Sequence, residues 1–431
     1  MFGNPWWVTL FFAIGVLATG TAILSLFFAF GRRPEALWAT CLPPYDSEDF
    51  LRALAGVDNA PVASGGTAEV LNNGDEFYPA MLRAIRAAER SITFMVYIWE
   101  DGRVSDQFLD AMIERAQAVV EVRVLLDAFG AMNAPGEKFD KLKAAGGKVA
   151  TFRGPKFGKL RRFHLRNHRR AVVIDGRVGF TGGAAVGDKW RGDARNTDEW
   201  REIMVRVTGP LARGLQAAFA QLWANTVGEI LAGPAFYPTD EETEEGDAVC
   251  RHVHYVSSPS NEAHPLRKAF GLSFMAARER LYITSAYFAP DAHMRQEMIK
   301  RARLGVDVRV LTANDYTDLK PVRWAGHSYY EELLEGGVRI YEYQRTFLHS
   351  KVFVGDGIWS VVGSANMDVR SKELNEENVI GILDRGFGEQ LERTFFTDLE
   401  HSREIQLDEW RQRGLWQRFL ERFFVLFVEQ Y

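Results

Sequence analysis

Residues 168–176 read HRRAVVIDG, and residues 349–357 read HSKVFVGDG. Each stretch places a histidine two positions before a cation and seven positions before an Asp-Gly pair. Because alternate residues of a strand share a face, each histidine is expected to point the same way as that cation. Asp-Gly is typical of a tight hairpin turn, and the next predicted strand leads to Gly183 in one copy and to Ser364 in the other. The matched spacing predicts one site assembled from two copies.

The flanking sequence is repeated as well. Residues 87–97 resemble residues 276–287, and in both a helix end runs into a strand rich in β-branched and aromatic residues. Strands that alternate with helices indicate an α/β architecture. We therefore expect two similar halves that pack against each other. The predicted segments are a first half over 66–232, an acidic linker over 233–250 and a second half over 251–405.

Composition excludes several classes of protein. The chain has 431 residues, of which 47% are hydrophobic and 25% charged, so it can bury a large core and is neither disordered nor collagen-like. Its net charge of −5 argues against a general nucleic-acid-binding protein. The two cysteines, Cys41 and Cys250, form no CxxC pair and indicate no redox compartment.

The N-terminus predicts a membrane anchor. Residues 6–30 contain no charged residue and are long enough to cross a bilayer, so we expect a transmembrane helix over 5–31. A cleavable signal peptide, the alternative, needs basic residues before a shorter apolar run. Arg32 and Arg33 follow the run, and the positive-inside rule then places the rest of the chain in the cytoplasm. The predicted location is the inner membrane, with a single span.

The C-terminus, over 406–431, predicts an amphipathic helix with a broad apolar face. Such a helix lies in a lipid interface or docks on the globular core, and the sequence leaves both readings open.

The paired stretches suggest phosphoryl-transfer chemistry. Two cations can hold the non-bridging oxygens of a phosphate and stabilise developing charge. One imidazole can attack phosphorus, and the other can exchange protons with the leaving and entering oxygens. A carboxylate usually orients such a histidine through its second ring nitrogen. Glu202 and Glu377 stand 34 and 28 residues after the histidines of their own halves and are the candidates, with Asp198 as a rival to Glu202.

These motifs resemble the phospholipase D superfamily, in which two HxKxxxxD copies meet in one active site without a metal. Further segments resemble bacterial cardiolipin synthases. They are 70–79, 175–183, 200–210, 287–290, 333–344, 363–371 and 374–377.

The resemblance implies two α-β-α sandwich halves with pseudo-two-fold symmetry, no cofactor and no metal. It implies that His168 is the nucleophile and His349 the acid/base. The implied catalytic residues are His168, Arg170, Asp175, Glu202, His349, Lys351, Asp356 and Glu377, and the implied substrate-binding residues are Gly183, Ser364 and Asn366. Three positions of the first half depart from the family pattern, namely Arg170 for lysine, Ala185 opposite Asn366, and Glu202 for aspartate.

The implied reaction is transfer of a phosphatidyl group, in which two phosphatidylglycerol molecules give cardiolipin and glycerol. The partners expected are phospholipids and a bilayer, and no nucleic acid. The alternatives are hydrolysis by a phospholipase D, a nuclease, and a scaffold with a decayed site. A basic run over 153–170 is expected to attract an anion. His252 and His254 alternate along a strand, which explains their spacing better than a metal site does.

Overall fold

The computed structural model describes residues 6–29, 37–58, 60–154, 165–239, 250–259 and 264–427. The chain divides into two compact units, Met1–Trp38 and Ala39–Tyr431. The first unit contains helix α1, Trp6–Ala29, inside the predicted span 5–31. Among the residues described, no helix meets the length and hydropathy required of a membrane span. The transmembrane assignment therefore stays a prediction.

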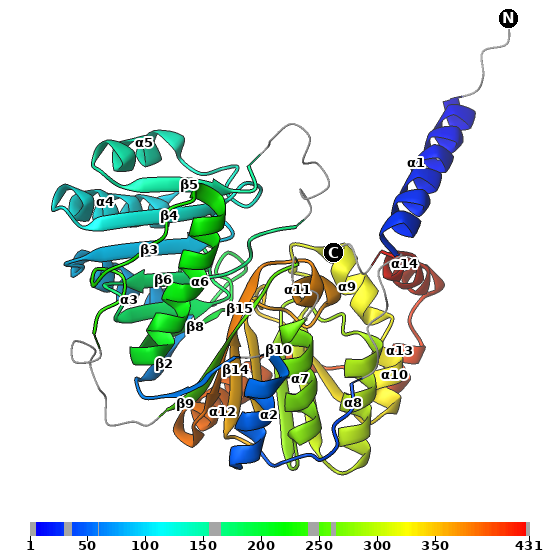
Figure 1. Ribbon diagram of the computed structural model, residues 1–431. Coiled ribbons are helices and arrows are strands. Elements are labelled where there is room, and N and C mark those ends of the chain that lie inside the picture. The colour runs from blue at the N-terminus through cyan, green and yellow to red at the C-terminus, as the bar shows by residue number, and fades with distance from the viewer. Residues whose placement is uncertain are drawn as a thin grey trace, which may run out of the picture. The chain divides into compact units, whose positions relative to one another are not determined.

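The second unit is a mixed α/β fold built on two sheets (Figure 1). The seven-stranded sheet contains β2 (Ala68–Asn72), β3 (Ser91–Val96), β4 (Glu121–Asp127), β5 (Lys148–Phe152), β6 (Ala171–Ile174), β7 (Val178–Gly182) and β8 (Ile203–Thr208). The nine-stranded sheet contains β1 (Val62–Ser64), β9 (Arg251–Ser257), β10 (Arg280–Ser285), β11 (Asp307–Ala313), β12 (Arg339–Tyr343), β13 (Lys351–Gly355), β14 (Trp359–Gly363), β15 (Glu377–Leu383) and β16 (Ser402–Glu404).

The strand orders confirm the predicted repeat. The first sheet runs β2-β8-β7-β6-β3-β4-β5, and the second contains β9-β15-β14-β13-β10-β11-β12 between its edge strands β1 and β16. In both sheets the strands of the first βαβ unit pair in parallel, β3 with β4 and β10 with β11. The strand that follows the histidine, β6 or β13, pairs antiparallel with β3 or β10. The two halves therefore present the strands that follow their histidines at the same place in the sheet.

The Asp-Gly pairs form the hairpin turns that the sequence predicts. Asp175 and Gly176 join β6 to β7 with φ values of 55° and 67°, and Asp356 and Gly357 join β13 to β14 with φ values of 51° and 67°. Positive φ at both central positions is typical of a type I′ turn, whose twist matches that of the flanking strands. Each aspartate also accepts hydrogen bonds from three successive backbone amides, those of residues 89–91 or 278–280. These carboxylates tie the hairpin to the start of the neighbouring strand.

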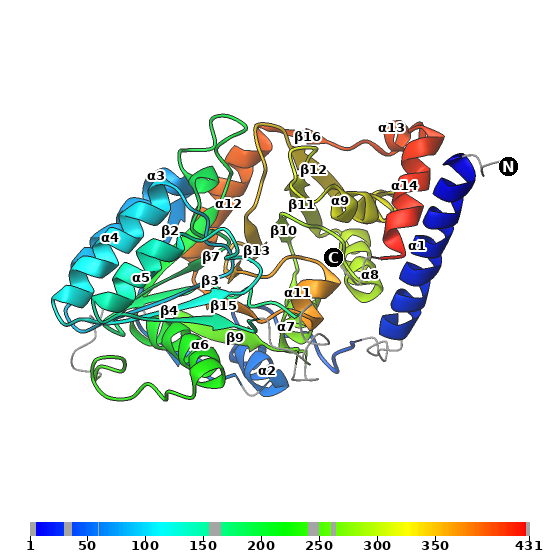
Figure 2. The same ribbon diagram turned by 90° about the horizontal axis from the view of Figure 1, so that it is seen from above.

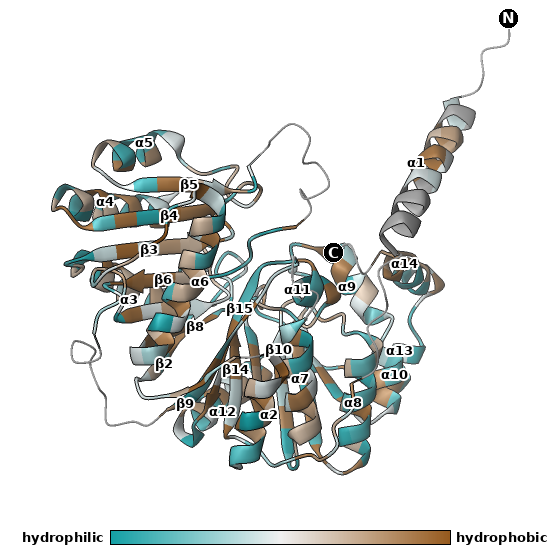
Figure 3. Ribbon diagram, viewed as in Figure 1, coloured by the Kyte–Doolittle hydropathy of each residue, from teal (hydrophilic) through white to brown (hydrophobic). Residues whose placement is uncertain are grey.

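Helices cover both faces of each sheet. They are α2 (Glu48–Asp58), α3 (Asn73–Arg86), α4 (Arg103–Gln117), α5 (Gly136–Ala144), α6 (Gly209–Val227), α7 (Pro265–Ala276), α8 (Ala292–Arg303), α9 (Lys320–His327), α10 (Tyr330–Glu335), α11 (Val369–Glu373), α12 (Arg385–Leu399), α13 (Leu407–Arg411) and α14 (Leu415–Val425). Figure 3 shows hydrophobic residues concentrated along the strands, with hydrophilic residues recurring on the covering helices. This pattern buries the sheets on both sides.

One hydrophobic cluster joins the halves. Helix α6 packs on β6 and β7 and reaches β9, and α12 packs on β13 and β14 and reaches β2 (Figures 1 and 2). Phe219 of α6 and Leu391 of α12 lie in the same cluster, together with inward-facing residues of both sheets. The shared core fixes the orientation of one half relative to the other.

Two segments differ from the sequence-based boundaries, and a third is not described. Residues 39–64 were not assigned to either half, yet β1 pairs antiparallel with β9, and Phe50 of α2 lies in the core of the second half. The C-terminal region contains two helices, α13 and α14, where one helix over 406–431 is expected. The acidic part of the linker, residues 240–249, lies outside the described residues.

Candidate active site

Backbone hydrogen bonds between the halves bring the two histidines into one site. His168 donates its amide hydrogen to the carbonyl of Glu376 at 2.9 Å, and the amide of Glu376 bonds to Arg166 at 2.8 Å. The other pair is bonded in the same way. The amide of His349 donates to the carbonyl of Arg201 at 2.8 Å, and the amide of Arg201 donates to the carbonyl of Phe347 at 3.0 Å. The segment before each histidine thus runs parallel to the segment before the other half's glutamate.

This exchange pairs each histidine with a carboxylate of the opposite half. Nδ1 of His168 lies 2.8 Å and 3.0 Å from the two carboxylate oxygens of Glu377. Nδ1 of His349 lies 2.6 Å from Oε2 of Glu202. The expectation that each glutamate serves the histidine of its own half is therefore wrong. Asp198, the rival candidate, is exposed, and its backbone amide donates to the side-chain oxygen of Asn196.

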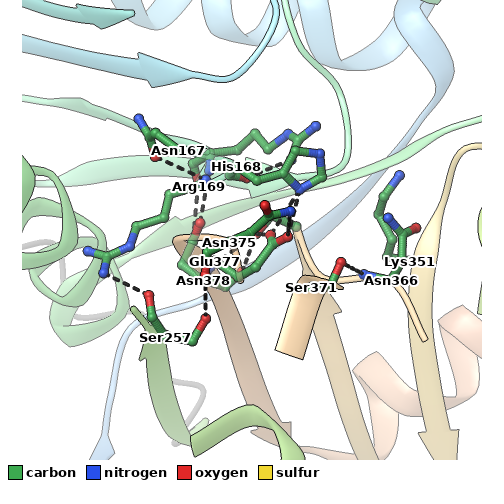
Figure 4. A network of polar contacts seen from close by, with 12 residues as sticks. Asn167, His168, Arg169, Ser257, Lys351, Asn366, Ser371, Asn375, Glu377 and Asn378 are labelled. Atoms are coloured by element: carbon green, nitrogen blue, oxygen red, sulfur yellow. Dashed lines mark hydrogen bonds and ion pairs between the residues drawn. The ribbon is translucent and has the colours of Figure 1, made fainter. Parts of the chain in front are cut away.

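A carboxylate at Nδ1 favours the tautomer that carries a proton there, which leaves the lone pair of Nε2 free to react. Figure 4 shows the ring of His168 with one edge toward Glu377 and the other toward Lys351 and Asn366. Both histidine side chains are buried. The arrangement suits an imidazole that attacks, or exchanges a proton, at Nε2.

Gly183 and Ser364 occupy equivalent places next to these carboxylates. A Cβ atom on Gly183 would lie 2.4 Å from Oε2 of Glu202, so only glycine leaves room for that carboxylate. The hydroxyl of Ser364 instead donates a short hydrogen bond to Glu377. The small residues that the sequence singles out therefore support the glutamates.

The two cations meet at the site from opposite halves. Nη1 of Arg170 donates to the carbonyl of His168 at 2.6 Å, and Lys351 donates to the carbonyl of His349. Nζ of Lys351 also lies 2.9 Å from Nδ1 of His349. Nε and Nη2 of Arg170 and Oδ1 of Asn366 are buried with no hydrogen-bond partner in the described part of the chain. The two nitrogens of Arg170 can donate hydrogen bonds to the oxygens of a phosphate.

The charges of Arg170 and Lys351 act on both histidines, as expected of four side chains in one site. Burial lowers the pKa of His168, and the charges of Arg170 and Lys351 lower it further. Burial followed by Lys351 and Arg170 lowers the pKa of His349 in the same way. Each histidine therefore feels the cation of the other half.

Burial also shifts the groups around the histidines. It raises the pKa of Glu202 to about 7 and that of Glu377 to about 8, against the opposing effects of Lys351 and Arg170, respectively. It lowers the pKa of Lys351 to about 7. Strong shifts of several neighbouring groups, caused by burial and mutual charge, are typical of catalytic sites.

The two histidines differ in their aromatic surroundings. The ring centroid of Tyr97 lies 5.0 Å from that of His168. His349 is contacted by the rings of Trp190, Trp200, Tyr287 and Phe347, at centroid distances of 5.6, 5.4, 6.4 and 5.4 Å. We call these four residues the aromatic shell. No sequence pattern predicts this shell, although Trp200 and Tyr287 belong to segments that carry the resemblance.

Other predicted residues do not join the histidines. Asp175 and Asp356 each follow their histidine by seven residues and lie just beyond the far ends of β6 and β13. At the rise of a strand, this places each on the order of 20 Å from its histidine. Their bonds to backbone amides give them a structural role.

The basic run over 153–170 is only partly described, because residues 155–164 fall outside the described ranges. Arg169, within it, is fully buried and pairs with Glu376 at 2.8 Å. This arginine joins the two halves through Glu376 and is not exposed to an anionic headgroup in solution. Nδ1 of His252 on β9 donates to the carbonyl of Cys250. Among the described residues, no three His, Cys, Asp or Glu side chains converge as metal ligands do.

Comparison with known proteins agrees with this geometry. The family model described as cardiolipin synthase, PLD-like domain, matches residues 81–223 and 273–399, which contain both histidines. A cardiolipin synthase of Geobacillus kaustophilus is 32% identical over 86% of this chain and 74% of that relative. Cardiolipin synthase A of Pseudomonas syringae is 34% identical over 83% of this chain and 74% of the relative.

A solved structure, that of phosphatidylserine synthase from Haemophilus influenzae, shares the fold. Its TM-score is 0.69 at 15% identity, covering 89% of this chain and all of that one. The long sequence matches and the family model carry the assignment beyond the fold. The chain belongs to the cardiolipin synthase family of phospholipase D-like proteins.

Proposed function

We propose that this protein is a phosphatidyltransferase that converts two molecules of phosphatidylglycerol into cardiolipin and glycerol. The observation that carries the proposal is the pair of buried histidines, each oriented by a glutamate of the opposite half. The names of its relatives, cardiolipin synthases, support the same reaction.

In the first step, Nε2 of His168 attacks the phosphorus of one phosphatidylglycerol. The bond from phosphorus to the glycerol oxygen breaks, and His349 donates a proton to that oxygen. In the second step, His349 takes the proton from a hydroxyl of a second phosphatidylglycerol. That oxygen attacks phosphorus, the phosphorus–nitrogen bond breaks, and His168 is restored.

The cations supply most of the transition-state stabilisation in this scheme. The unpartnered edge of Arg170 and the ammonium of Lys351 hold the non-bridging oxygens as negative charge develops on them. The side chain of Asn366 adds a polar contact from the second half, where Ala185 offers none in the first.

Hydrolysis by a phospholipase D is the second candidate, since the same intermediate can react with water. The aromatic shell favours transfer, because four rings around the acid/base histidine limit the access of water to it. A nuclease is disfavoured by the net charge of −5 and by the buried, aromatic setting of His349.

The deciding experiment incubates the purified full chain with phosphatidylglycerol in detergent micelles and identifies the lipid products. We expect cardiolipin and free glycerol, with His168→Ala and His349→Ala each losing more than about 10³-fold in rate. Phosphatidic acid as the main product would support the hydrolase, and unchanged rates in both variants would overturn the site.

We also propose that the protein works at the inner membrane with its second unit in the cytoplasm. The uncharged segment 6–30, followed by Arg32 and Arg33, supports an N-terminal anchor over 5–31. Mapping which side of the membrane a protease attacks would test the orientation.

A further inference from the structure

Helix α14 packs on the rest of the second unit with a polar side inward, whereas an amphipathic helix on a globular protein usually turns its apolar side inward. Its one fully buried residue is Glu421, and the ring of Phe424 packs beside Trp324 of α9 at a centroid distance of 5.1 Å. Globular proteins usually turn the apolar stripe of a surface helix inward and leave carboxylates in water.

The buried carboxylate is held by specific partners. Arg413 forms a two-pronged ion pair with Glu421, through Nε at 3.0 Å and Nη2 at 2.9 Å. Nδ1 of the buried His327 lies 4.0 Å from the same carboxylate. A buried, paired charge with this geometry specifies how the helix is rotated. The rotation of α14 is therefore a fixed feature of the fold.

With that rotation, the apolar stripe faces outward. Leu415, Trp416, Phe419, Phe423 and Leu426 are 83%, 70%, 54%, 43% and 72% exposed. The rings of Trp416, Phe419 and Phe423 stack in succession, at centroid distances of 5.4 Å and 6.2 Å. We call these five residues the outer stripe. A contiguous exposed patch of this kind marks an interaction surface.

The chemistry of the outer stripe fits a lipid surface. Tryptophan and phenylalanine are favoured at the boundary between headgroups and acyl chains. Arg422 is exposed beside Phe423 of the stripe, where it can contact anionic headgroups. The helix has 11 residues and is about 16 Å long, too short to span a bilayer, so it would lie in the plane of the interface.

We propose that the outer stripe of α14 inserts into the surface of an anionic phospholipid bilayer. Only the choice of lipid rests on the proposed function, because the substrate there is itself an anionic lipid. The ion pair between Glu421 of α14 and Arg413, which precedes the helix, then fixes the angle between the second unit and the bilayer.

The test places an environment-sensitive fluorophore on the full chain at position 419, as Phe419→Cys, with the exposed Cys41 replaced by serine; Cys250 is buried. His349→Ala is included so that no turnover occurs. Val119→Cys, at an apolar residue that is 89% exposed on the first half, is the matched control. Both proteins are reconstituted in vesicles of phosphatidylglycerol and phosphatidylcholine that carry nitroxide lipids.

We expect the label at 419 to be quenched by the nitroxide lipids and protected from aqueous iodide, and the label at 119 to behave in the opposite way. Quenching of the 419 label by iodide alone would overturn the proposal. Protection from both quenchers would also overturn it, because protein would then cover the stripe. Neither result depends on catalysis, so a failure here is distinguishable from a failure of the proposed reaction.

Discussion

The surroundings of His168 and His349 diverge although the same backbone arrangement holds both. His168 faces a glutamate fixed by the hydroxyl of Ser364, whereas the glutamate at His349 has Gly183 beside it and a lysine nearby. His349 also has the aromatic shell. The repeat thus supplies two imidazoles in one site, and their different neighbours fit the separate roles proposed for them.

The sharpest test of this comparison exchanges the two carboxylates for amides. Glu377→Gln and Glu202→Gln should each slow transfer by about 10³-fold or more, because a glutamine no longer secures the reactive tautomer. With a donor whose leaving group needs no proton, such as a p-nitrophenyl phosphodiester, Glu202→Gln should still form the phosphohistidine and accumulate it. Glu377→Gln should not form it. Labelled-phosphate trapping measures both.

The crosswise pairing decides that pattern. If each glutamate served the histidine of its own half, the two variants would exchange their behaviour. Ser364→Ala is a suitable control, since it removes a hydroxyl next to Glu377 and leaves both carboxylates in place.

Gly183→Ala should be more damaging than Ser364→Ala. The added methyl would lie 2.4 Å from Oε2 of Glu202 and displace it, and a displacement of about 1 Å in a catalytic group can cost about 10²-fold. Ser364→Ala only removes a hydrogen bond and should cost about tenfold or less. Comparison of kcat values, with circular dichroism to verify folding, checks the ranking, and equal losses would contradict the idea that Gly183 makes room.

Lys351 should set the alkaline limit of activity. Burial lowers the pKa of its ammonium to about 7, so in the free enzyme its charge is lost as the pH rises through that value. Loss of this charge should lower kcat/KM on the alkaline side, and it opposes the gain from ionisation of Glu202 and Glu377, whose pKa values are about 7 and about 8. Lys351→Arg keeps its charge, so its alkaline limb should move upward, even if its maximal rate is lower. An unchanged limb would assign the titration to another group.

Arg170→Lys should have the smallest effect. It restores the residue that the family pattern has there and keeps the charge next to His168, so we expect a change within about threefold in kcat. Arg170→Met, which keeps the length of the side chain but not its charge, should lose about 10²-fold or more. Similar rates for all three proteins would show that this position does not contact the phosphate.

The fold and the identity of the histidines could be predicted because both depend on local signals. Strand alternation and the Asp-Gly turns lie within a few residues of each other, and the repeat doubles each signal. The partner of each histidine could not be predicted, because Glu202 and Glu377 occupy equivalent places and the sequence does not specify which half each one faces. Only the docked halves resolve that symmetry.

The role of the aspartates was obscured for a related reason. Asp175 recurs with its histidine at a fixed spacing, which is equally consistent with a catalytic role and with a turn that positions the strand. The attachment of residues 39–64 to the second half left no signal either, because the three residues of β1 show no periodicity. Such long-range pairings depend on tertiary packing.

The exchange of backbone bonds at Asn167 and Glu376 has a consequence for how the enzyme is made. During synthesis, His168 emerges more than two hundred residues before Glu377, the group that completes it. A half-finished chain, or a fragment released by a protease between the halves, therefore lacks the carboxylate that orients His168, the proposed nucleophile. An enzyme built in this way would be inactive until the whole polypeptide has folded, so incomplete chains would not modify the lipids of the cell.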